Sequence, residues 1–531
     1  MRTSPVFAVR LTRAAIFVHR WLGVALCAVF LIWFPSGIGM MYWDFPDVSP
    51  GDRLERMPAL DASKVRLSPE QAYATIADGP LPTPVRLNSF DGRPVYRFGD
   101  EGIVFADTGE QWDVSPELML RVAAAWTGQP ANAARVESVD EVDQWTVGGV
   151  FRERPLWKYS WPDGQQVYVS ENSGEVVQYT TTGSRLGAYV GAIPHWLYFT
   201  PLRKHGPEWS RLVIWSSGIG TFAALLGVAI GLWMYSPSKR YRNAGVPTSI
   251  PYRGQKRWHT VFGLLFGLGA ATWAFSGMLS MDPFPSPTGG PAGGRRAPGG
   301  AGIPQALRGR VEMTAYAAKP AREALAQLSQ LHVKELEFTS FAGDPIYLAT
   351  LAGGDTYIVP VDGPPRASFD PDRVINVVTL AAGRGGLADI RVLEQYDAYY
   401  LDRRRERPLP VVLARLNDAT ATRYYINPKT GRVVGTYNSR GWMNRWLYHG
   451  LHSLDFPWLY NYRPLWDIVV ITFMVGGTAL CVTSLILAWR VIGRTLGGAI
   501  PGAAGGHSEL SDDLVVEGES SGGRRQADQS G

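Results

Sequence analysis

Cysteine is nearly absent from this sequence. Only Cys27 and Cys481 occur among 531 residues, and both lie inside long apolar segments. The polar regions of the chain therefore contain no disulfide, no thiolate metal site and no cysteine nucleophile. Several enzyme motifs are missing as well: no Gly-x-Gly-x-x-Gly follows a predicted strand, and the sequence has no P-loop, His-Glu-x-x-His or nucleophile elbow. A built-in NAD or flavin domain is not expected, so electrons for any redox chemistry must come from another molecule.

Charged residues are also scarce. They make up 19% of the chain, and the mean hydropathy is −0.07. This charged fraction is low for a soluble protein, and this mean hydropathy is too low for a protein buried wholly in lipid. We therefore expect membrane helices combined with sizeable water-exposed domains. Four segments are long and apolar enough to span about 30 Å of hydrocarbon, which takes roughly 20 residues: Ala14–Met41, Leu212–Tyr235, Thr260–Met281 and Ile468–Trp489. The first is too long for a cleaved signal peptide and has no convincing cleavage site, which favours an uncleaved helix.

The distribution of Lys and Arg predicts the orientation of these helices, because cytoplasmic flanks carry an excess of both residues. Basic residues cluster in the N-terminus, in the short loop between helices 2 and 3, and after helix 4: Arg2, Arg10, Arg13, Arg20, Lys239, Arg240, Arg242, Arg253, Lys256, Arg257, Arg490 and Arg494. Both termini are therefore expected in the cytoplasm of a bacterial inner membrane, and the two long loops in the periplasm. The net charge of +5 follows from this bias and does not indicate nucleic-acid binding.

The sequence contains an internal repeat. His259, Gly263, Trp273, Ser276 and Gly277 follow His19, Gly23, Trp33, Ser36 and Gly37 at a constant offset of 240 residues. Later motifs also recur: Arg152-Glu-Arg-Pro-Leu156 resembles Arg405-Glu-Arg-Pro-Leu409, and a Trp-Leu-Tyr motif begins at Trp196 and again at Trp446. We expect two tandem copies of helix, outer domain and helix, related by a pseudo-twofold axis along the membrane normal.

Both outer segments have the alternating pattern of α+β domains. Ser68 followed by Pro69 predicts the start of a short helix, and β-strands separated by turn residues follow it. In the first segment we expect strands at Val85–Leu87, Val95–Phe98, Ile103–Ala106, Lys158–Trp161, Gln166–Ser170 and Val176–Tyr179. In the second we expect a helix at Ala321–Leu331 and strands at Glu335–Thr339, Ile346–Leu351 and Thr356–Val359.

These patterns predict a membrane α-helical fold with four transmembrane helices in two repeats and two periplasmic α+β domains. A Gly/Pro-rich linker is expected at residues 286–302. The expected order is the N-terminus with helix 1 (1–43), outer domain 1 (44–211), helix 2 (212–235), a cytoplasmic loop (236–259), helix 3 (260–281), outer domain 2 (282–467), helix 4 (468–490) and a disordered cytoplasmic tail (491–531).

Histidines gather at the ends of the predicted helices. His19 and His259 lie near the cytoplasmic ends of helices 1 and 3, and the outer ends of helices 2 and 4 carry His195, His205, His449 and His452. Ionisable residues at such depths are functional candidates, and neutral imidazole is a common axial ligand of haem iron. Two b-type haems, one at each level, would carry electrons across the bilayer. Without Cys-x-x-Cys-His, neither would be attached covalently.

The inner ligands are predicted to be His19 and His259, with Arg20 and Arg257 placed to pair with haem propionates. The outer ligands are less determined. His449 and His452 are three residues apart, a rise of about 4.5 Å on a helix, so at most one of them should bind the outer iron. We predict His195 and His449 as the outer ligands and assign His452 a supporting role. In the simpler interpretation, these interfacial histidines only form hydrogen bonds with headgroups or backbone.

Several motifs resemble the PepSY-associated transmembrane family of bacterial inner-membrane proteins. They are Phe17-Val-His-Arg-Trp-Leu-Gly23, Trp258-His-Thr-Val-Phe-Gly263, and Leu447-Tyr-His-Gly-Leu-His-Ser-Leu-Asp-Phe456 before Pro464-Leu-Trp466, while Ser68–Asp107 and Tyr424–Val434 are similar to PepSY units. The resemblance implies an iron-regulated membrane protein whose haem histidines correspond to His19 and His259, and then to His195, His449 and His452. Some members are b-haem reductases that release iron from ferric siderophores.

The first hypothesis is therefore a di-haem electron carrier that reduces a ferric siderophore or another iron chelate with electrons from an unidentified donor. The alternative is a haem-free PepSY protein with a binding or regulatory role. A siderophore permease is disfavoured, because four helices with small cytoplasmic loops provide little machinery for alternating access. Membrane lipid is an expected partner in all cases. The sequence identifies neither the donor nor the oligomeric state.

Overall fold

The computed structural model describes residues 5–99, 102–284, 302–402 and 404–497. The chain divides into two compact units, each assembled from segments that are distant in sequence. The helical unit comprises residues 1–44, 187–285 and 447–531, and the β-rich unit comprises residues 45–186 and 286–446. Of the predicted linker (286–302) only Gly302 is among the described residues, and residues 498–531 of the predicted tail lie outside them.

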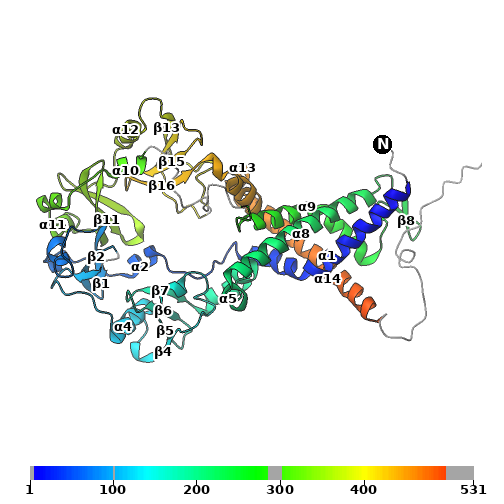
Figure 1. Ribbon diagram of the computed structural model, residues 1–531, viewed down its shortest axis with the longest axis horizontal. Coiled ribbons are helices and arrows are strands. Elements are labelled where there is room, and N and C mark those ends of the chain that lie inside the picture. The colour runs from blue at the N-terminus through cyan, green and yellow to red at the C-terminus, as the bar shows by residue number, and fades with distance from the viewer. Residues whose placement is uncertain (1–4, 100–101, 285–301, 403, 498–531) are drawn as a thin grey trace, which may run out of the picture. The chain divides into compact units, whose positions relative to one another are not determined.

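Four long helices form the helical unit (Figure 1): α1 (Pro5–Gly39), α8 (Gly206–Met234), α9 (Gly254–Leu279) and α14 (Leu465–Gly497). Within the described residues these are the helices that are long and apolar enough to cross a membrane, which confirms the four predicted spans. Their bounds differ from the predicted ones because the helical backbone continues past the apolar stretch. In α14 the helix extends over residues 491–497, which the sequence had assigned to the tail.

Short elements connect the long helices. They are α5 (Thr182–Val190), α6 (Ala192–Trp196), α7 (Thr200–Arg203), the hairpin strands β8 (Tyr241–Asn243) and β9 (Val246–Thr248), a π-helix (Met443–Gly450) and α13 (Pro457–Tyr460). The hairpin lies between α8 and α9, in the basic loop.

Aromatic rings pack against glycines in the middle of the four-helix bundle. A Cβ atom added at Gly220 would lie 2.4 Å from the Phe30 ring, and one at Gly477 would lie 2.6 Å from the Phe34 ring. Small residues allow this close packing of helices in lipid, where water exclusion does not drive association. Phe34 also meets Trp273 with ring centres 6.1 Å apart. Aromatic side chains therefore pack closely between the helices of the bundle.

A six-stranded antiparallel sheet is the main feature of the β-rich unit. Its strand order is β12-β11-β10-β1-β2-β3. The strands are β1 (Val85–Phe90), β2 (Arg93–Phe98), β3 (Ile103–Phe105), β10 (Val333–Phe341), β11 (Asp344–Leu351) and β12 (Thr356–Pro360). All six were predicted from the sequence, with ends that differ by up to three residues.

The pairing of β1 with β10 joins the two outer segments in one sheet. Val85 lies opposite Phe338, and Leu87 lies opposite Leu336, and this face is buried. Each set of three strands would otherwise leave a long edge with unpaired backbone groups, which favours association. The two segments predicted as separate outer domains thus share a common sheet and core.

Two four-stranded antiparallel sheets complete the β-rich unit. One has the order β4-β5-β6-β7 and the other β13-β14-β15-β16. Their bounds are β4 (Arg135–Ser138), β5 (Leu156–Ser160), β6 (Gln166–Ser170), β7 (Val176–Thr180), β13 (Leu387–Leu393), β14 (Val411–Leu416), β15 (Arg423–Asn427) and β16 (Arg432–Tyr437). The helices of this unit are α2 (Pro50–Arg56), α3 (Pro69–Tyr73), α4 (Pro116–Thr127), α10 (Ile303–Arg308), α11 (Ala321–Ala326) and α12 (Pro371–Ala382).

Ser68 caps α3 as its sequence predicts. The Ser68 hydroxyl accepts from the Gln71 backbone N–H, and the Gln71 side chain accepts from the Ser68 N–H. This reciprocal capping box satisfies two backbone donors that a short helix would otherwise leave exposed.

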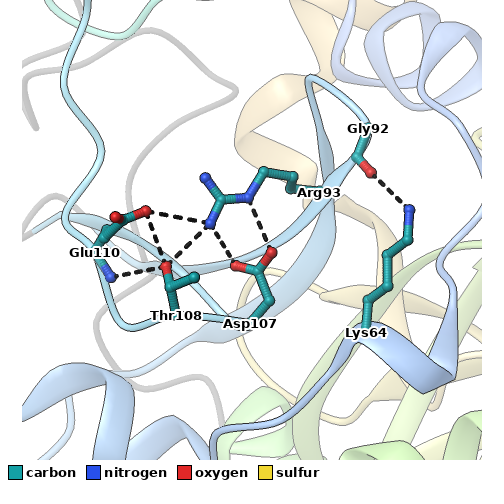
Figure 2. A network of polar contacts seen from close by, with 6 residues as sticks. All are labelled: Lys64, Gly92, Arg93, Asp107, Thr108 and Glu110. Carbon is teal, nitrogen blue, oxygen red and sulfur yellow. Dashed lines mark hydrogen bonds and ion pairs between the residues drawn. The ribbon is translucent and has the colours of Figure 1, made fainter.

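A polar network ties β2 to the loop after β3 (Figure 2). Arg93 donates from Nε to Asp107 Oδ2 at 2.9 Å and from Nη2 to Asp107 Oδ1 at 2.7 Å, and it also contacts Thr108 and Glu110. The bond to the Arg93 guanidinium lowers the pKa of Asp107 below its usual value. Because the groups satisfy one another, we assign this network a structural role.

Glu335 on β10 is a buried carboxyl group whose charge opposes folding. Its side chain accepts from Asn88 Nδ2 at 3.2 Å, and burial raises its pKa above the ordinary value of 4.5. A raised pKa in the folded state contributes stability below pH 4.5 that is lost as the pH rises through the folded-state value.

We therefore expect Glu335→Gln to raise the melting temperature of the β-rich unit at pH 7, with a gain that disappears below pH 4.5. Thermal unfolding of the full-length protein, followed by circular dichroism across a pH series, measures this effect. Glu312→Gln, at an exposed position, is the control and should change little. A lower melting temperature for Glu335→Gln at pH 7 would contradict the interpretation.

Candidate functional site

Four histidines of the helical unit form two facing pairs. His19 on α1 and His259 on α9 have ring centres 6.1 Å apart. His195 on α6 and His452, in the helical turn after the π-helix, have ring centres 5.9 Å apart. The sequence had paired His19 with His259. At the outer level, the imidazole that faces His195 belongs to His452 and not to His449.

Each histidine of the inner pair is held through its Nδ1 atom by a neighbouring helix. His19 Nδ1 lies 3.0 Å from the Ala223 carbonyl oxygen on α8. His259 Nδ1 lies 3.4 Å from Thr483 Oγ1 and 3.3 Å from Ser484 Oγ on α14. A backbone carbonyl only accepts, so the His19 ring must donate its Nδ1 proton there.

The outer pair is held in the same way. His195 Nδ1 lies 3.2 Å from the Trp33 carbonyl oxygen and 3.3 Å from Ser36 Oγ. His452 Nδ1 lies 3.0 Å from Ser276 Oγ. Ser36 and Ser276 are the repeated serines of α1 and α9, so the repeat positions an equivalent hydroxyl against each outer imidazole.

The carbonyl partners determine the tautomer of two rings. The Ala223 carbonyl at His19 and the Trp33 carbonyl at His195 only accept, so Nδ1 carries the proton in both rings, and Nε2 has the lone pair that a metal ion requires. The hydroxyls at the other two rings also lie within hydrogen-bond distance of carbonyls of their own helices: Ser276 of Trp273 at 3.1 Å, and both Thr483 and Ser484 of Leu480 at 2.8 Å. A hydroxyl that donates to its carbonyl is an acceptor for the imidazole, which gives His259 and His452 the same arrangement.

The spacing within the pairs suits a metal ion held between two imidazoles. A metal ion lies about 2 Å from a coordinated imidazole nitrogen and the ring centre is roughly 1 Å further, so two rings that share one ion have centres roughly 6 Å apart. The observed values are 6.1 and 5.9 Å. Hydrogen bonds from the second ring nitrogen are also the usual way in which proteins orient metal-binding histidines.

The two pairs lie at different depths along the helices. His19 and Ser36 are both on α1, and 17 residues of helix separate them, a rise of roughly 25 Å. His259 and Ser276 have the same separation on α9. Because Ser36 and Ser276 contact the outer pair, the two pairs are separated by a distance close to the thickness of the hydrocarbon core, about 30 Å.

The outer pair lines a cavity of about 270 Å³. Besides His195 and His452, its walls are mostly aromatic and small side chains: Phe30, Trp33, Phe34, Trp196, Tyr198, Trp209, Trp273, Tyr448, Ala270, Ala274, Gly277 and Ser280, with Val213, Ser217, Met281 and Met474. An apolar pocket with a few convergent polar groups is typical of cofactor sites. Flat aromatic walls and two imidazoles fit the planar macrocycle of haem.

A shared set of contacts surrounds His195 and His452. The indole of Trp209 donates to the carbonyl of Trp196, the residue after His195, at 2.8 Å. The indole of Trp466 donates to the carbonyl of Ser453, the residue after His452, at 2.9 Å. Trp466, Ser453 and His452 lie 257 positions after Trp209, Trp196 and His195, respectively. The Trp-Leu-Tyr motifs at Trp196 and Trp446 recur at an offset of 250 residues, which places Phe199 and not His195 opposite His449 in the sequence repeat.

The remaining predicted residues lie near these pairs or outside them. Arg20 is exposed beside Phe17 and Trp21, and Arg257 donates from Nη1 to Thr248 of β9 at 2.7 Å. The Arg203 guanidinium lies over the cavity residues Tyr198 and Trp209, at 5.0 and 4.5 Å from the ring centres. His449 is exposed, with its ring 4.6 Å from that of Tyr448.

Gly227 on α8 is a site residue that sequence reasoning missed. A Cβ atom at this position would lie 2.5 Å from Cε1 of His19, so the absence of a side chain allows the imidazole to lie against α8. Gly23, a glycine of the sequence repeat, has no atom within 4 Å of such a Cβ. The sequence repeat does not reveal Gly227, because the residue 257 positions after it is Ser484 and not a glycine.

The described residues do not favour a metal site of any other kind. Among the residues that the structure describes, no group of three or more His, Cys, Asp or Glu is arranged to hold a metal ion. The imidazole pairs are therefore the candidate metal ligands in this part of the chain.

The family model of the PepSY-associated TM region matches residues 17–354, well over half of the chain. This range includes His19, His195 and His259 but ends before His452. No curated protein sequence matches significantly.

Proposed function

This chain belongs to the family of the PepSY-associated TM region, and on that premise we propose that it is a b-type di-haem protein of a bacterial inner membrane. In this proposal it moves electrons across the membrane to a periplasmic acceptor, an iron(III) chelate such as a ferric siderophore. The observation that supports this proposal is the presence of two facing pairs of imidazoles, in which every Nδ1 atom lies within hydrogen-bond distance of a partner on another segment.

The proposed orientation has both termini in the cytoplasm and the β-rich unit in the periplasm. Arg10 and Arg13 near the start of α1, the basic loop between α8 and α9, and Arg490 and Arg494 near the end of α14 support it, because basic residues favour the cytoplasmic flank. We also propose that the two halves are tandem repeats. The shared contacts of Trp209 and Trp466 support this relation.

The residues of the chain hold and insulate the two sites. His19 with His259, and His195 with His452, would supply the axial nitrogens. When bound, haem supplies an iron that alternates between the ferric and ferrous states and so stores one electron at a time. Aromatic side chains of the outer cavity, among them Phe34 and Trp273, would exclude water from the surroundings of the outer site. Arg20, Arg257 and Arg203 provide positive charge for carboxylate groups at the two levels.

The function is tested with protein in sealed proteoliposomes. The protein is reduced by a donor trapped inside, and ferric citrate, which does not cross the bilayer, is added outside. We expect the visible spectrum of the reduced protein to return to the oxidised form and ferrous iron to appear outside. Protein that binds haem but is not reoxidised would contradict iron-chelate reduction, and protein without haem would favour the haem-free binding protein.

We expect Ser276→Ala to weaken haem binding at the outer level by about tenfold, because removal of a hydrogen-bond partner of a metal-binding histidine typically costs this much or more. Transfer of haem to excess apomyoglobin measures the loss. Ser280→Ala is the control, since Ser280 lines the same cavity but donates to the Gly277 carbonyl. Equal haem retention by both variants would mean that Ser276 does not orient His452.

A further inference from the structure

His449 lies beside the outer site and is exposed on the protein surface. Sequence analysis predicted it as an axial ligand, but His452 takes the position that faces His195. Residues three apart share one face of an α-helix. Here the π-helix ends at Gly450, between these two histidines, so the two rings have different surroundings. Short π-helical segments occur frequently at functional sites.

Tyr448 connects the exposed ring with the buried one. Its ring centre lies 4.6 Å from that of His449 and 5.6 Å from that of His452. Tyr448 also lines the cavity of the outer site. The three rings thus form a short contiguous path of aromatic side chains from the cavity to the protein surface.

The backbone around His449 is fixed. Its carbonyl oxygen accepts from the Ser453 N–H at 3.1 Å and from the Asp455 N–H at 3.5 Å. The segment therefore folds back on itself directly after the histidine. This closure holds the exposed imidazole at a defined place relative to Tyr448.

We propose that His449 and Tyr448 form the docking contact for the iron(III) chelate, the point at which the electron leaves the protein. This inference rests on the proposed function. An imidazole N–H can donate a hydrogen bond to the oxygen atoms of a chelate, and a chelate at His449 would be separated from the outer site only by the Tyr448 ring. Of the histidines at the outer level, His449 combines exposure with a ring contact to a cavity residue.

The redox step is a one-electron transfer. The iron(III) of the chelate becomes iron(II), and the reduced protein loses one electron that it received from dithionite in the assay. The bonds between iron and the oxygen atoms of the chelate remain in place during the transfer, and no proton is required.

The experiment compares rates of reoxidation of the dithionite-reduced, detergent-purified full-length protein. Ferric citrate and a ferric trihydroxamate chelate are the acceptors, and ferricyanide serves as a small oxidant that needs no docking contact. We expect His449→Ala to slow reoxidation by both iron chelates by about tenfold, since loss of a positioning contact affects reaction rates on this scale. Haem content, the reduced spectrum and the ferricyanide rate should stay unchanged.

His205→Ala is the matched control. His205 is also exposed and precedes α8 at the same level, and it is not among the residues that line the cavity. It should react with the chelates at the wild-type rate. Tyr448→Leu is a second variant, which removes the intervening ring and should slow both chelates as well.

Wild-type chelate rates in His449→Ala at full haem content would overturn the docking contact while leaving the proposed function intact. An equal loss in His205→Ala would also overturn it, because the effect would then not depend on the path through Tyr448. Wild-type protein that contains no haem would instead overturn the proposed function itself.

Discussion

His452→Ala should remove one of two haems from the protein, whereas His449→Ala should keep both. His452 is the residue whose ring faces His195 at 5.9 Å and whose Nδ1 atom is held by Ser276 at 3.0 Å. Without it, the outer iron would have a single axial histidine in a cavity shaped for two. We expect haem content to fall from about two to about one per chain, measured as pyridine haemochrome against protein concentration.

The comparison with His449→Ala provides its own control, because the two residues are three positions apart in one segment. If His449→Ala lost haem and His452→Ala retained it, His449 would be the axial ligand that the sequence predicts, and the pairing of His195 with His452 at the outer iron would be wrong. If both variants retained two haems, neither histidine would be an axial ligand.

Gly227→Ala should disrupt the inner site. The added Cβ atom would lie 2.5 Å from Cε1 of His19, far inside van der Waals contact. Overpacking of this kind costs about 1–3 kcal/mol, and the displaced imidazole would lose its bond to the Ala223 carbonyl. We expect haem affinity at the inner level to fall at least about tenfold, so that one of two reduction steps is lost in a spectroelectrochemical titration.

Gly23→Ala is the matched control for this prediction. It makes the same exchange on the membrane helix that carries His19, but the new Cβ atom would have open space around it. Alanine also favours helix more than glycine does, so neither variant should unfold for lack of helix propensity. If Gly227→Ala kept both reduction steps, the close approach of His19 to α8 would be excluded. If Gly23→Ala also lost a reduction step, the loss in Gly227→Ala would not be specific to contact with His19.

The elements with strong periodicity could be predicted from the sequence. The four apolar helices and the six strands of the shared sheet were expected at nearly their observed positions, since hydrophobic length and alternation depend on local residues alone. The inner pair was also predictable. His19 and His259 are the first members of a repeat with constant spacing, and two helices of equal direction place them at one depth.

The outer pair could not be predicted in the same way. A shift of seven residues is two helical turns, so the Trp-Leu-Tyr motifs at Trp196 and Trp446 looked equivalent although the structural counterpart of His195 is His452. No local sequence feature predicts the π-helix, which ends between His449 and His452 and gives the two rings different surroundings. Which backbone carbonyl or hydroxyl receives each Nδ1 proton depends on helix packing and is likewise not encoded in local pattern.

The shared sheet was missed for a related reason. The β1 and β10 strands are more than 240 residues apart, and their pairing depends on two edges that match in length and register. Alternation predicts a strand but not its neighbour. The two outer segments were therefore expected as separate domains, although their first strands lie side by side in the middle of one sheet.

The most direct test of the central claim is a difference spectrum of the detergent-purified protein, dithionite-reduced minus air-oxidised, with haem quantified per chain. We expect a sharp α-band typical of b-type haem with two histidine ligands and about two haems per chain. A flat spectrum from protein expressed with ample haem would contradict it. The facing imidazole pairs would then be a structural feature of the bundle, and the β-rich unit would have to carry the function.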